Sequence, residues 1–214
     1  MKKMFAAVLA VTVWSALAIQ LVVSINMGLS RGFGWLFGVS MYVAFFTVTT
    51  NFLVALAVTV PLIAPRSAAA RFFASAQAIT GVAASIVMVC VIYNTLLAHI
   101  WNPRGLGRLA DLLLHDVVPT LFVAYWWIVV PKRSIPWRAA ALWGIYPIVY
   151  FVYAMTRGLI TGFYPYPFIN LASIGPAAVI LNALGVLLAY FVILSALVAL
   201  KSSFRAEAVP ETAA

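Results

Sequence analysis

Six apolar stretches of about 20 residues each take up nearly the whole chain, and one stretch of that length can cross a bilayer as a helix. Short segments that are polar or contain Pro and Gly separate them. Backbone polar groups in lipid must be satisfied internally, and the stretches lack the alternation of barrel strands, so they predict transmembrane helices. The expected spans are 4–25, 39–63, 74–100, 112–130, 137–155 and 174–200.

The sequence therefore predicts an all-α, polytopic membrane protein, a bundle of six transmembrane helices. Of the 214 residues, 66% are hydrophobic and 8% are charged, and a single water-soluble core could not bury that much apolar surface. We expect residues 1–200 to form one six-helix transmembrane domain. Residues 201–214 are polar and are expected to form a short, disordered cytoplasmic tail.

The N-terminal stretch also has features of a cleavable signal peptide: two lysines, an apolar run and then Ala16-Leu17-Ala18. However, the apolar run continues past this point to Ile25, which makes it long enough to cross the membrane. We therefore expect it to remain in the protein as the first transmembrane helix.

The basic residues predict the orientation of the bundle. A net charge of +9 would suit a nucleic-acid partner, but the Lys and Arg residues are scattered in the connections, so we expect no nucleic-acid binding. Four basic residues fall on one side of the membrane: Arg31, Arg104, Arg108 and Arg157. The other nine fall on the opposite side: Lys2, Lys3, Arg66, Arg71, Lys132, Arg133, Arg138, Lys201 and Arg205. The positive-inside rule then predicts a multi-pass protein of the cell membrane with both termini in the cytoplasm.

Cys90 is the only cysteine, so the chain has no internal disulfide and cannot build a metal site from cysteines. We expect no metal and no cofactor. The expected partners are membrane lipids, and the sequence leaves the oligomeric state open.

Polar residues inside the spans are the candidate functional residues, because a polar group in hydrocarbon is costly without a partner. Under the predicted topology these residues all lie in the outer half of the membrane. Thr47 is about eight residues into its span, which corresponds to a depth of roughly 12 Å. The set comprises Thr47, Thr49, Thr50, Asn51, Asn94, His99, Asp111, His115 and Asp116.

Two pairs in this set are spaced four residues apart. Thr47 and Asn51 therefore share one face of the second span, and Asp111 and His115 share one face of the fourth. Polar faces of membrane helices normally turn toward the bundle interior, so the two faces are expected to be able to meet.

Each candidate also has a structural interpretation. A Thr in a membrane helix commonly bonds its own backbone four residues back, and Asn51 and Asn94 would serve equally well as hydrogen bonds between helices. His115 is either an active-site base or a member of a buried ionisable network. The aromatic and Pro-rich segment 157–168 is either an interfacial aromatic belt or a lid over an outward-facing cavity.

Three motifs carry a resemblance to a known family. They are Phe45-Phe46-Thr47-Val48-Thr49-Thr50-Asn51, His115-Asp116-Val117-Val118-Pro119 and Tyr164-Pro165-Tyr166-Pro167-Phe168. In these motifs, and in their order and helix positions, the chain resembles the androgen-induced six-helix membrane proteins and their bacterial relatives. The resemblance implies a membrane threonine hydrolase of lipid esters, notably fatty acid esters of hydroxy fatty acids, with Thr47 and His115 as the catalytic pair. Thr49 or Thr50 is the alternative counterpart of the nucleophile.

The pair also makes chemical sense by itself, because a Thr hydroxyl becomes a good nucleophile only when an adjacent base takes its proton. Asp111 or Asp116 would then fix the imidazole tautomer. The oxyanion stabiliser stays open among Asn51, Asn94 and a tyrosine hydroxyl, with Tyr164 and Tyr166 as further supporting candidates.

Two other functions compete with the hydrolase. A small transporter or channel would use the outer polar cluster as a binding site or proton relay, but the cytoplasmic halves of the spans are nearly devoid of polar residues. A non-catalytic membrane scaffold would use the same residues only to hold helices together.

Overall fold

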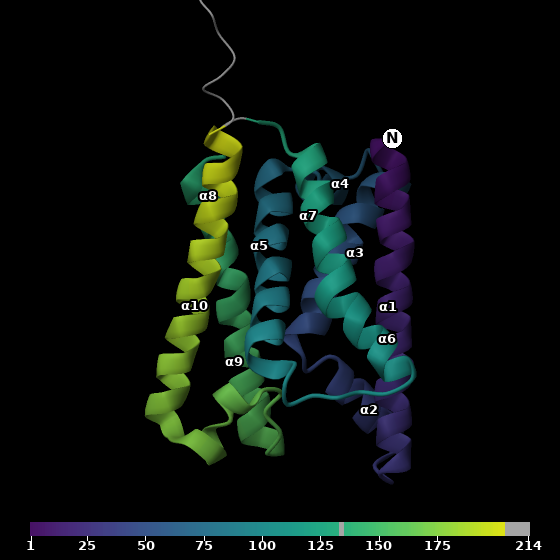
Figure 1. The fold of residues 1–214 in the computed structure, drawn as a ribbon, viewed down its shortest axis with the longest axis vertical. Coiled ribbons are helices and arrows are strands. Elements are labelled where there is room, and N and C mark those ends of the chain that lie inside the picture. The colour runs from purple at the N-terminus through teal and green to yellow at the C-terminus, as the bar shows by residue number, and fades with distance from the viewer. Residues whose placement is uncertain (133–134, 204–214) are drawn as a thin grey trace, which may run out of the picture.

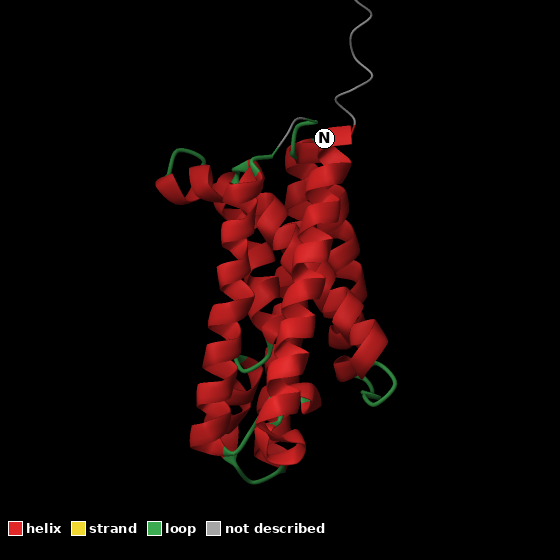
Figure 2. Cartoon of the chain, turned by 90° about the vertical axis from the view of Figure 1, so that its left-hand side faces the viewer, coloured by secondary structure: helices red, strands yellow, loops and turns green. Residues whose placement is uncertain are grey.

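The computed structural model describes residues 1–132 and 135–203. Throughout these two ranges the regular structure is helical, with no strand (Figure 2). Six helices in this part of the chain are long and apolar enough to cross a membrane, which confirms the predicted all-α six-helix membrane bundle. These spans are Lys2–Ser30, Phe46–Ile63, Ala76–Leu97, Leu106–Val129, Trp137–Thr161 and Leu171–Ser203.

Several spans are composed of more than one helical element. Figure 1 shows the six spans side by side along the long axis of the molecule. In chain order the elements are α1 (Lys2–Ser30), α2 (Gly34–Tyr42), α3 (Phe46–Ile63), α4 (Ala68–Phe73), α5 (Ala76–Ile92), the π-helix η1 (Tyr93–Leu97), α6 (Leu106–Leu112), the π-helix η2 (Leu113–Val117), α7 (Val118–Val129), α8 (Trp137–Ala141), η3 (Leu142–Gly144), α9 (Ile145–Thr161), η4 (Pro167–Ile169) and α10 (Leu171–Ser203).

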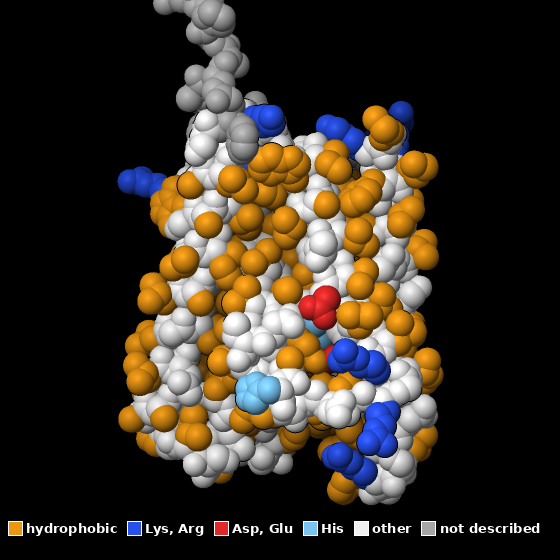
Figure 3. Space-filling view, viewed as in Figure 1, with side chains coloured by type: hydrophobic (Ala, Val, Ile, Leu, Met, Phe, Trp, Pro, Cys, Tyr) orange, Lys and Arg blue, Asp and Glu red, His pale blue; other side chains and the backbone are white. Residues whose placement is uncertain are grey.

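The N-terminus and the C-terminal end of α10 lie at the same end of the bundle (Figure 1). An even number of crossings produces this arrangement. Helices α2 and α6 lie toward the opposite end. Hydrophobic side chains cover the belt between the two ends, and Lys and Arg are found mainly near the ends (Figure 3), as expected for a protein surrounded by lipid.

The expected second span, 39–63, is wrong at its start. The chain leaves helical geometry at Phe45 (φ −88°, ψ 133°), so α2 is a separate short helix and the span begins at Phe46. Thr47 is therefore the second residue of α3 and not about eight residues into a helix. Two tyrosines of α9 stabilise the break: Tyr150 donates to the Ala44 carbonyl at 2.7 Å and Tyr153 donates to the Val43 carbonyl at 3.3 Å.

The close packing of α2 on α1 explains why the short helix can turn back. A Cβ atom added to Gly28 would lie 2.5 Å from the Gly34 carbonyl oxygen, and one added to Gly38 would lie 2.4 Å from the Ser24 carbonyl oxygen. Only glycine allows the two backbones to approach this closely.

Three other spans begin or end at residues different from the predicted ones. The fourth span begins at Leu106, and the fifth continues to Thr161, so Arg157 lies inside a helix and not after it. The sixth begins at Leu171 and kinks at Gly175 (φ +75°), next to Pro176. The end of α9 has a local cause, because Gly162 takes the left-handed conformation (φ +71°) that caps a helix.

The tail prediction is wrong at its beginning. Lys201 lies inside α10 and is fully buried, with 0% of its surface exposed. Its ammonium donates to the carbonyls of Trp127 at 2.7 Å and Val130 at 2.9 Å, and lies 4.8 and 4.4 Å from the ring centroids of Trp126 and Trp127. Lys201 thus satisfies carbonyls at the C-terminal end of α7 that no helical N–H can reach. Residues 204–214 of the expected tail, with Arg205, lie outside the described residues, as does Arg133.

We expect Lys201→Met to destabilise the bundle by about 1–3 kcal/mol, because the carbonyls of Trp127 and Val130 lose their donor. Thermal unfolding in detergent measures this change. Lys3→Met, at an exposed position of α1, is the matched control and should leave the melting temperature unchanged. An unchanged melting temperature in Lys201→Met would contradict the capping role.

Candidate active site

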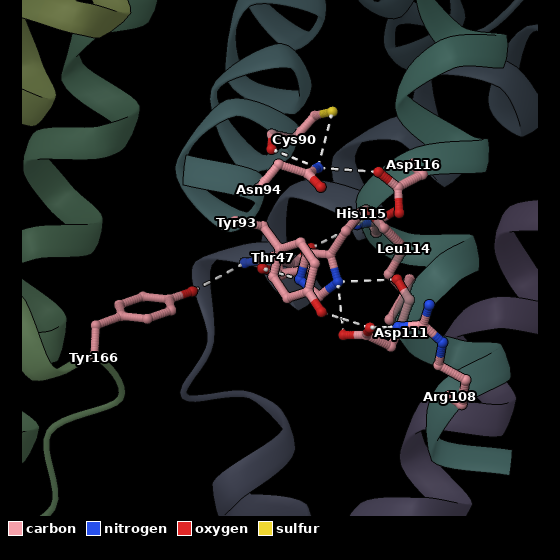
Figure 4. A network of polar contacts seen from close by, with 11 residues as sticks. Thr47, Cys90, Tyr93, Asn94, Arg108, Asp111, Leu114, His115, Asp116 and Tyr166 are labelled. Carbon is pink, nitrogen blue, oxygen red and sulfur yellow. Dashed lines mark hydrogen bonds and ion pairs between the residues drawn. The ribbon is translucent and has the colours of Figure 1, made fainter. Parts of the chain in front are cut away.

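Thr47 and His115 are in contact. The Thr47 hydroxyl oxygen lies 3.2 Å from the Nε2 atom of His115, and the two residues come from α3 and the π-helix η2 (Figure 4). Both side chains are largely buried: Thr47 is 9% exposed and the His115 side chain 14% exposed. The second and fourth spans therefore meet at the two residues that sequence reasoning paired.

The surroundings of His115 determine which ring nitrogen carries the proton. Nδ1 lies 2.9 Å from the backbone carbonyl oxygen of Asp111 and 3.2 Å from its carboxylate Oδ1. Both are acceptors, so in a neutral imidazole the proton is on Nδ1 and Nε2 has its lone pair free. Nε2 therefore faces the Thr47 hydroxyl as an acceptor, which is the arrangement a general base requires.

Asp111, and not Asp116, is the carboxylate that accompanies His115. Asp111 is 4% exposed, and its Oδ2 accepts a 2.5 Å hydrogen bond from the Tyr93 hydroxyl. Arg108 approaches the same oxygen at 3.6 Å from an exposed position. Oδ1 has no hydrogen-bond partner within the described ranges, so its charge remains available to an imidazolium formed at His115.

Asp116 belongs to a neighbouring pair. Its Oδ1 accepts a 3.0 Å hydrogen bond from the Asn94 amide, which also donates to the Cys90 carbonyl at 3.0 Å. Asn94 thus links the third span to the fourth and does not contact Thr47 (Figure 4). The structural interpretation of Asn94, a hydrogen bond between helices, fits this geometry.

Asn51 also joins helices. Fully buried, it donates from Nδ2 to the Thr47 carbonyl at 2.8 Å and to the Leu114 carbonyl at 3.3 Å. The second bond connects α3 to the π-helix that carries His115. Asn51 therefore fixes α3 relative to η2, the elements that carry Thr47 and His115. Its amide donates to backbone carbonyls and not to the Thr47 hydroxyl.

Thr49 and Thr50, the alternative nucleophiles, face a different partner. Each hydroxyl lies 2.9 Å from the hydroxyl of Tyr146 on α9, and Thr49 also donates to the Phe46 carbonyl at 3.1 Å. Neither has a hydrogen bond to His115. The geometry thus selects Thr47 among the three threonines.

Tyr166 and Tyr164 have different surroundings. The Tyr166 hydroxyl accepts a 3.4 Å hydrogen bond from the backbone N–H of Thr47. Burial raises the pKa of this hydroxyl above its usual value, although hydrogen bonds with Thr47 and Phe46 lower it, so it stays protonated at neutral pH. The Tyr164 ring instead covers Gly158, where a Cβ atom would lie 2.1 Å from the ring. Tyr166 is therefore at the site, and Tyr164 packs the connection against α9.

An apolar cavity of about 370 Å³ borders Thr47. Side chains of α3, α5, η1, α9, η4, α10 and the connection before η4 line it, and all are apolar except for four hydroxyl-bearing residues: Thr47, Tyr93, Tyr150 and Tyr166. Three of the lining side chains are also exposed on the outer surface of the bundle: Ile148 (46%), Ile180 (58%) and Leu184 (59%). The cavity therefore reaches the apolar side of the bundle at α9 and α10.

Sequence reasoning missed Tyr93, Tyr146 and Tyr150, which contribute hydroxyls at or beside the site. A tyrosine in an apolar run counts as a hydrophobic residue, so periodicity gives no signal for it. His99 lies away from the pair, on the exposed surface of the described chain. Among the described residues, no group of three or more His, Cys, Asp or Glu side chains could hold a metal ion.

Comparison with protein-family models, with curated proteins and with solved structures found no match for this chain.

Proposed function

We propose that this protein is an integral membrane hydrolase that cleaves a lipid or fatty-acid ester with Thr47 as nucleophile and His115 as general base. The proposal rests on one observation: the Thr47 hydroxyl lies 3.2 Å from Nε2 of His115, and Thr47 also lines an apolar cavity. A nucleophile, a base and a group that orients the base are the components of acyl transfer. The resemblance to the androgen-induced membrane proteins agrees with this chemistry.

The reaction would proceed in two steps. The Thr47 oxygen attacks the ester carbonyl carbon while its proton moves to Nε2 of His115, and the Asp111 carboxylate stabilises the imidazolium. The carbon–oxygen bond to the alcohol then breaks, and the alcohol leaves with the proton from Nε2. Water, deprotonated by His115, attacks the acyl-threonine; the bond to the Thr47 oxygen breaks, the carboxylic acid leaves, and the proton returns from Nε2 to the Thr47 oxygen.

The negative charge on the carbonyl oxygen needs hydrogen-bond donors. The best-placed group is the Tyr166 hydroxyl, which is protonated at neutral pH and lies beside Thr47. The first N–H groups of α3 have no acceptor within the helix; that of Thr47 donates to the Tyr166 hydroxyl and so strengthens this hydroxyl as a donor at the positive end of the helix dipole. Together they would stabilise the oxyanion of the tetrahedral intermediate.

The cavity supports a substrate with an alkyl chain. Its lining is apolar apart from hydroxyls, and an acyl chain placed there would be removed from water while the ester group sits at Thr47. The side opening lets a membrane lipid enter without leaving the bilayer. With both termini in the cytoplasm, as the basic residues predict, the site would serve the outer leaflet of the cell membrane.

Labelling with an alkyl fluorophosphonate tests the proposed function, because such reagents react with a hydroxyl nucleophile that a base activates. The purified protein in detergent should be labelled, and mass spectrometry should locate the adduct at Thr47. A transporter or a scaffold built from the same polar residues would give no labelling.

We expect Ala183→Phe, which places a large ring in the cavity, to lower the rate of labelling by a long-chain fluorophosphonate by at least about tenfold. Each buried methylene contributes about 0.8 kcal/mol, and 1.4 kcal/mol corresponds to tenfold. Labelling by a methyl fluorophosphonate should change much less, because it needs little of the cavity.

The matched control is Ala177→Phe, at an exposed position of α10 that does not line the cavity. The ratio of long-chain to methyl labelling should fall only in Ala183→Phe. If the ratio is the same in both variants and the wild type, the alkyl chain does not bind in this cavity.

A further inference from the structure

Tyr93 lies between the cavity and the imidazole of His115. It is 6% exposed and is the first residue of the π-helix η1. One face of its ring stacks on His115, with centroids 3.7 Å apart and planes 12° apart, and Tyr93 also lines the cavity. The ring therefore restricts the imidazole to a narrow range of orientations.

The Tyr93 hydroxyl fixes a second component of the site. It donates a 2.5 Å hydrogen bond to Oδ2 of Asp111, the carboxylate whose other oxygen lies 3.2 Å from Nδ1 of His115. Hydrogen bonds from a hydroxyl to a carboxylate are among the shorter and stronger ones in proteins. The position of the Asp111 charge relative to the imidazole thus depends on Tyr93.

Two π-helical segments bring these groups together. η1 contributes Tyr93 and Asn94, and η2 contributes His115 and Asp116, so that Tyr93 stacks on His115 while Asn94 bonds Asp116 (Figure 4). A π-turn is rare and is often found at functional sites, because its extra residue changes which way the side chains point. Here two π-turns face each other, and together they place Tyr93 against His115, the candidate base.

We propose that Tyr93 is a positioning residue for His115, with two separable contributions: its ring holds the imidazole, and its hydroxyl holds the Asp111 carboxylate near Nδ1. As a statement about catalysis this rests on the proposed function. As a statement about the imidazole it stands by itself and has its own measurement. A tyrosine that only filled space would be replaceable by phenylalanine without consequence for Thr47.

The imidazole of His115 can be observed by NMR without overlap from many other signals, because the chain has only two histidines, His99 and His115. In a His99→Gln background, [15N]histidine NMR of the protein in detergent reports the tautomer of His115 alone. We expect a single neutral tautomer with the proton on Nδ1. Tyr93→Phe, which keeps the ring, should retain this signal, and Tyr93→Leu, which removes the stack, should give a mixture of tautomers.

Labelling of Thr47 by a methyl fluorophosphonate measures the consequence for reactivity. Tyr93→Phe should lower the rate by roughly tenfold, the size expected for one hydrogen bond to a charged group, and Tyr93→Leu by roughly a hundredfold. In an Asp111→Asn background, Tyr93→Phe should cause no further loss, because its hydroxyl acts through the carboxylate. The control is Tyr125→Phe, a buried tyrosine of α7 that stacks on Phe5 and should stay within twofold of the wild type.

The outcomes separate the two proposals. Wild-type rates in Tyr93→Phe, an additive loss in the Asp111→Asn background, or an unmixed Nδ1–H signal in Tyr93→Leu would each overturn the positioning role while leaving Thr47 as a nucleophile. The expected NMR signals without any labelling of the wild type would instead overturn the proposed function and leave the effect of Tyr93 on the imidazole in place. If Tyr93→Leu fails to fold, Tyr93→Phe and the double variant still decide.

Discussion

Thr47→Ala is expected to abolish fluorophosphonate labelling of the purified protein, with no adduct anywhere in the chain. Alanine has no hydroxyl to attack the phosphorus, and the base at His115 has no proton to accept. Thr47→Ser keeps a hydroxyl on the same carbon and should still be labelled. In-gel fluorescence, with mass spectrometry of the adduct, is the measurement.

The neighbouring threonines provide matched controls for this result. Thr49→Ala and Thr50→Ala remove the hydroxyls that face Tyr146 and should leave the adduct at Thr47. All three substitutions remove the same atoms within one stretch of α3, so a general loss of folding would affect them alike. Labelling that persists in Thr47→Ala but disappears in Thr49→Ala or Thr50→Ala would show that Thr47 is not the nucleophile and that Thr49 or Thr50 is.

His115→Gln is expected to lower the labelling rate by about 10²–10⁴-fold, the range typical of general-base catalysis. Glutamine can still form a hydrogen bond with Thr47, so the variant removes the base while preserving much of the contact. The rate should be followed over time, because slow residual labelling distinguishes a lost base from a lost nucleophile. His99→Gln, at an exposed position, is the control and should be labelled at the wild-type rate.

Thermal unfolding of the same His115→Gln sample shows whether the histidine is catalytic or structural. A residue retained for catalysis leaves stability unchanged, or raises it, when replaced. A large drop in melting temperature together with unchanged labelling of the folded fraction would place His115 in a structural network and refute the base assignment.

Most of the fold follows from hydropathy and length. Six stretches long enough to cross the bilayer define the spans, and the chain alternates direction with each crossing, so the architecture needs no further information. The ends of the spans were harder to predict. The break before Phe46 is stabilised by the hydroxyls of Tyr150 and Tyr153, which are more than 100 residues away in the chain, and no local pattern encodes that contact.

The pairing of Thr47 with His115 could be predicted because polar residues are rare in these spans and their spacing places them on helix faces. Which of the two carboxylates contacts His115 could not be predicted. Asp111 and Asp116 both flank His115, and the π-turn at 113–117 changes the direction of Asp116 relative to Asp111 compared with a regular α-helix. Tyr93 was missed for a different reason, since its aromatic ring fits an apolar run and only its contacts reveal the hydroxyl.

The sideways opening of the cavity between α9 and α10 has a consequence for assays of the proposed hydrolase. A ligand that arrives through the bilayer is presented at its mole fraction in the membrane or micelle, and not at its bulk molarity. Reaction rates should therefore fall when inert lipid or detergent is added at constant total substrate. Detergent tails of similar length would also occupy the same channel, so kinetic constants for this protein carry meaning only when the amphiphile and its ratio to substrate are stated.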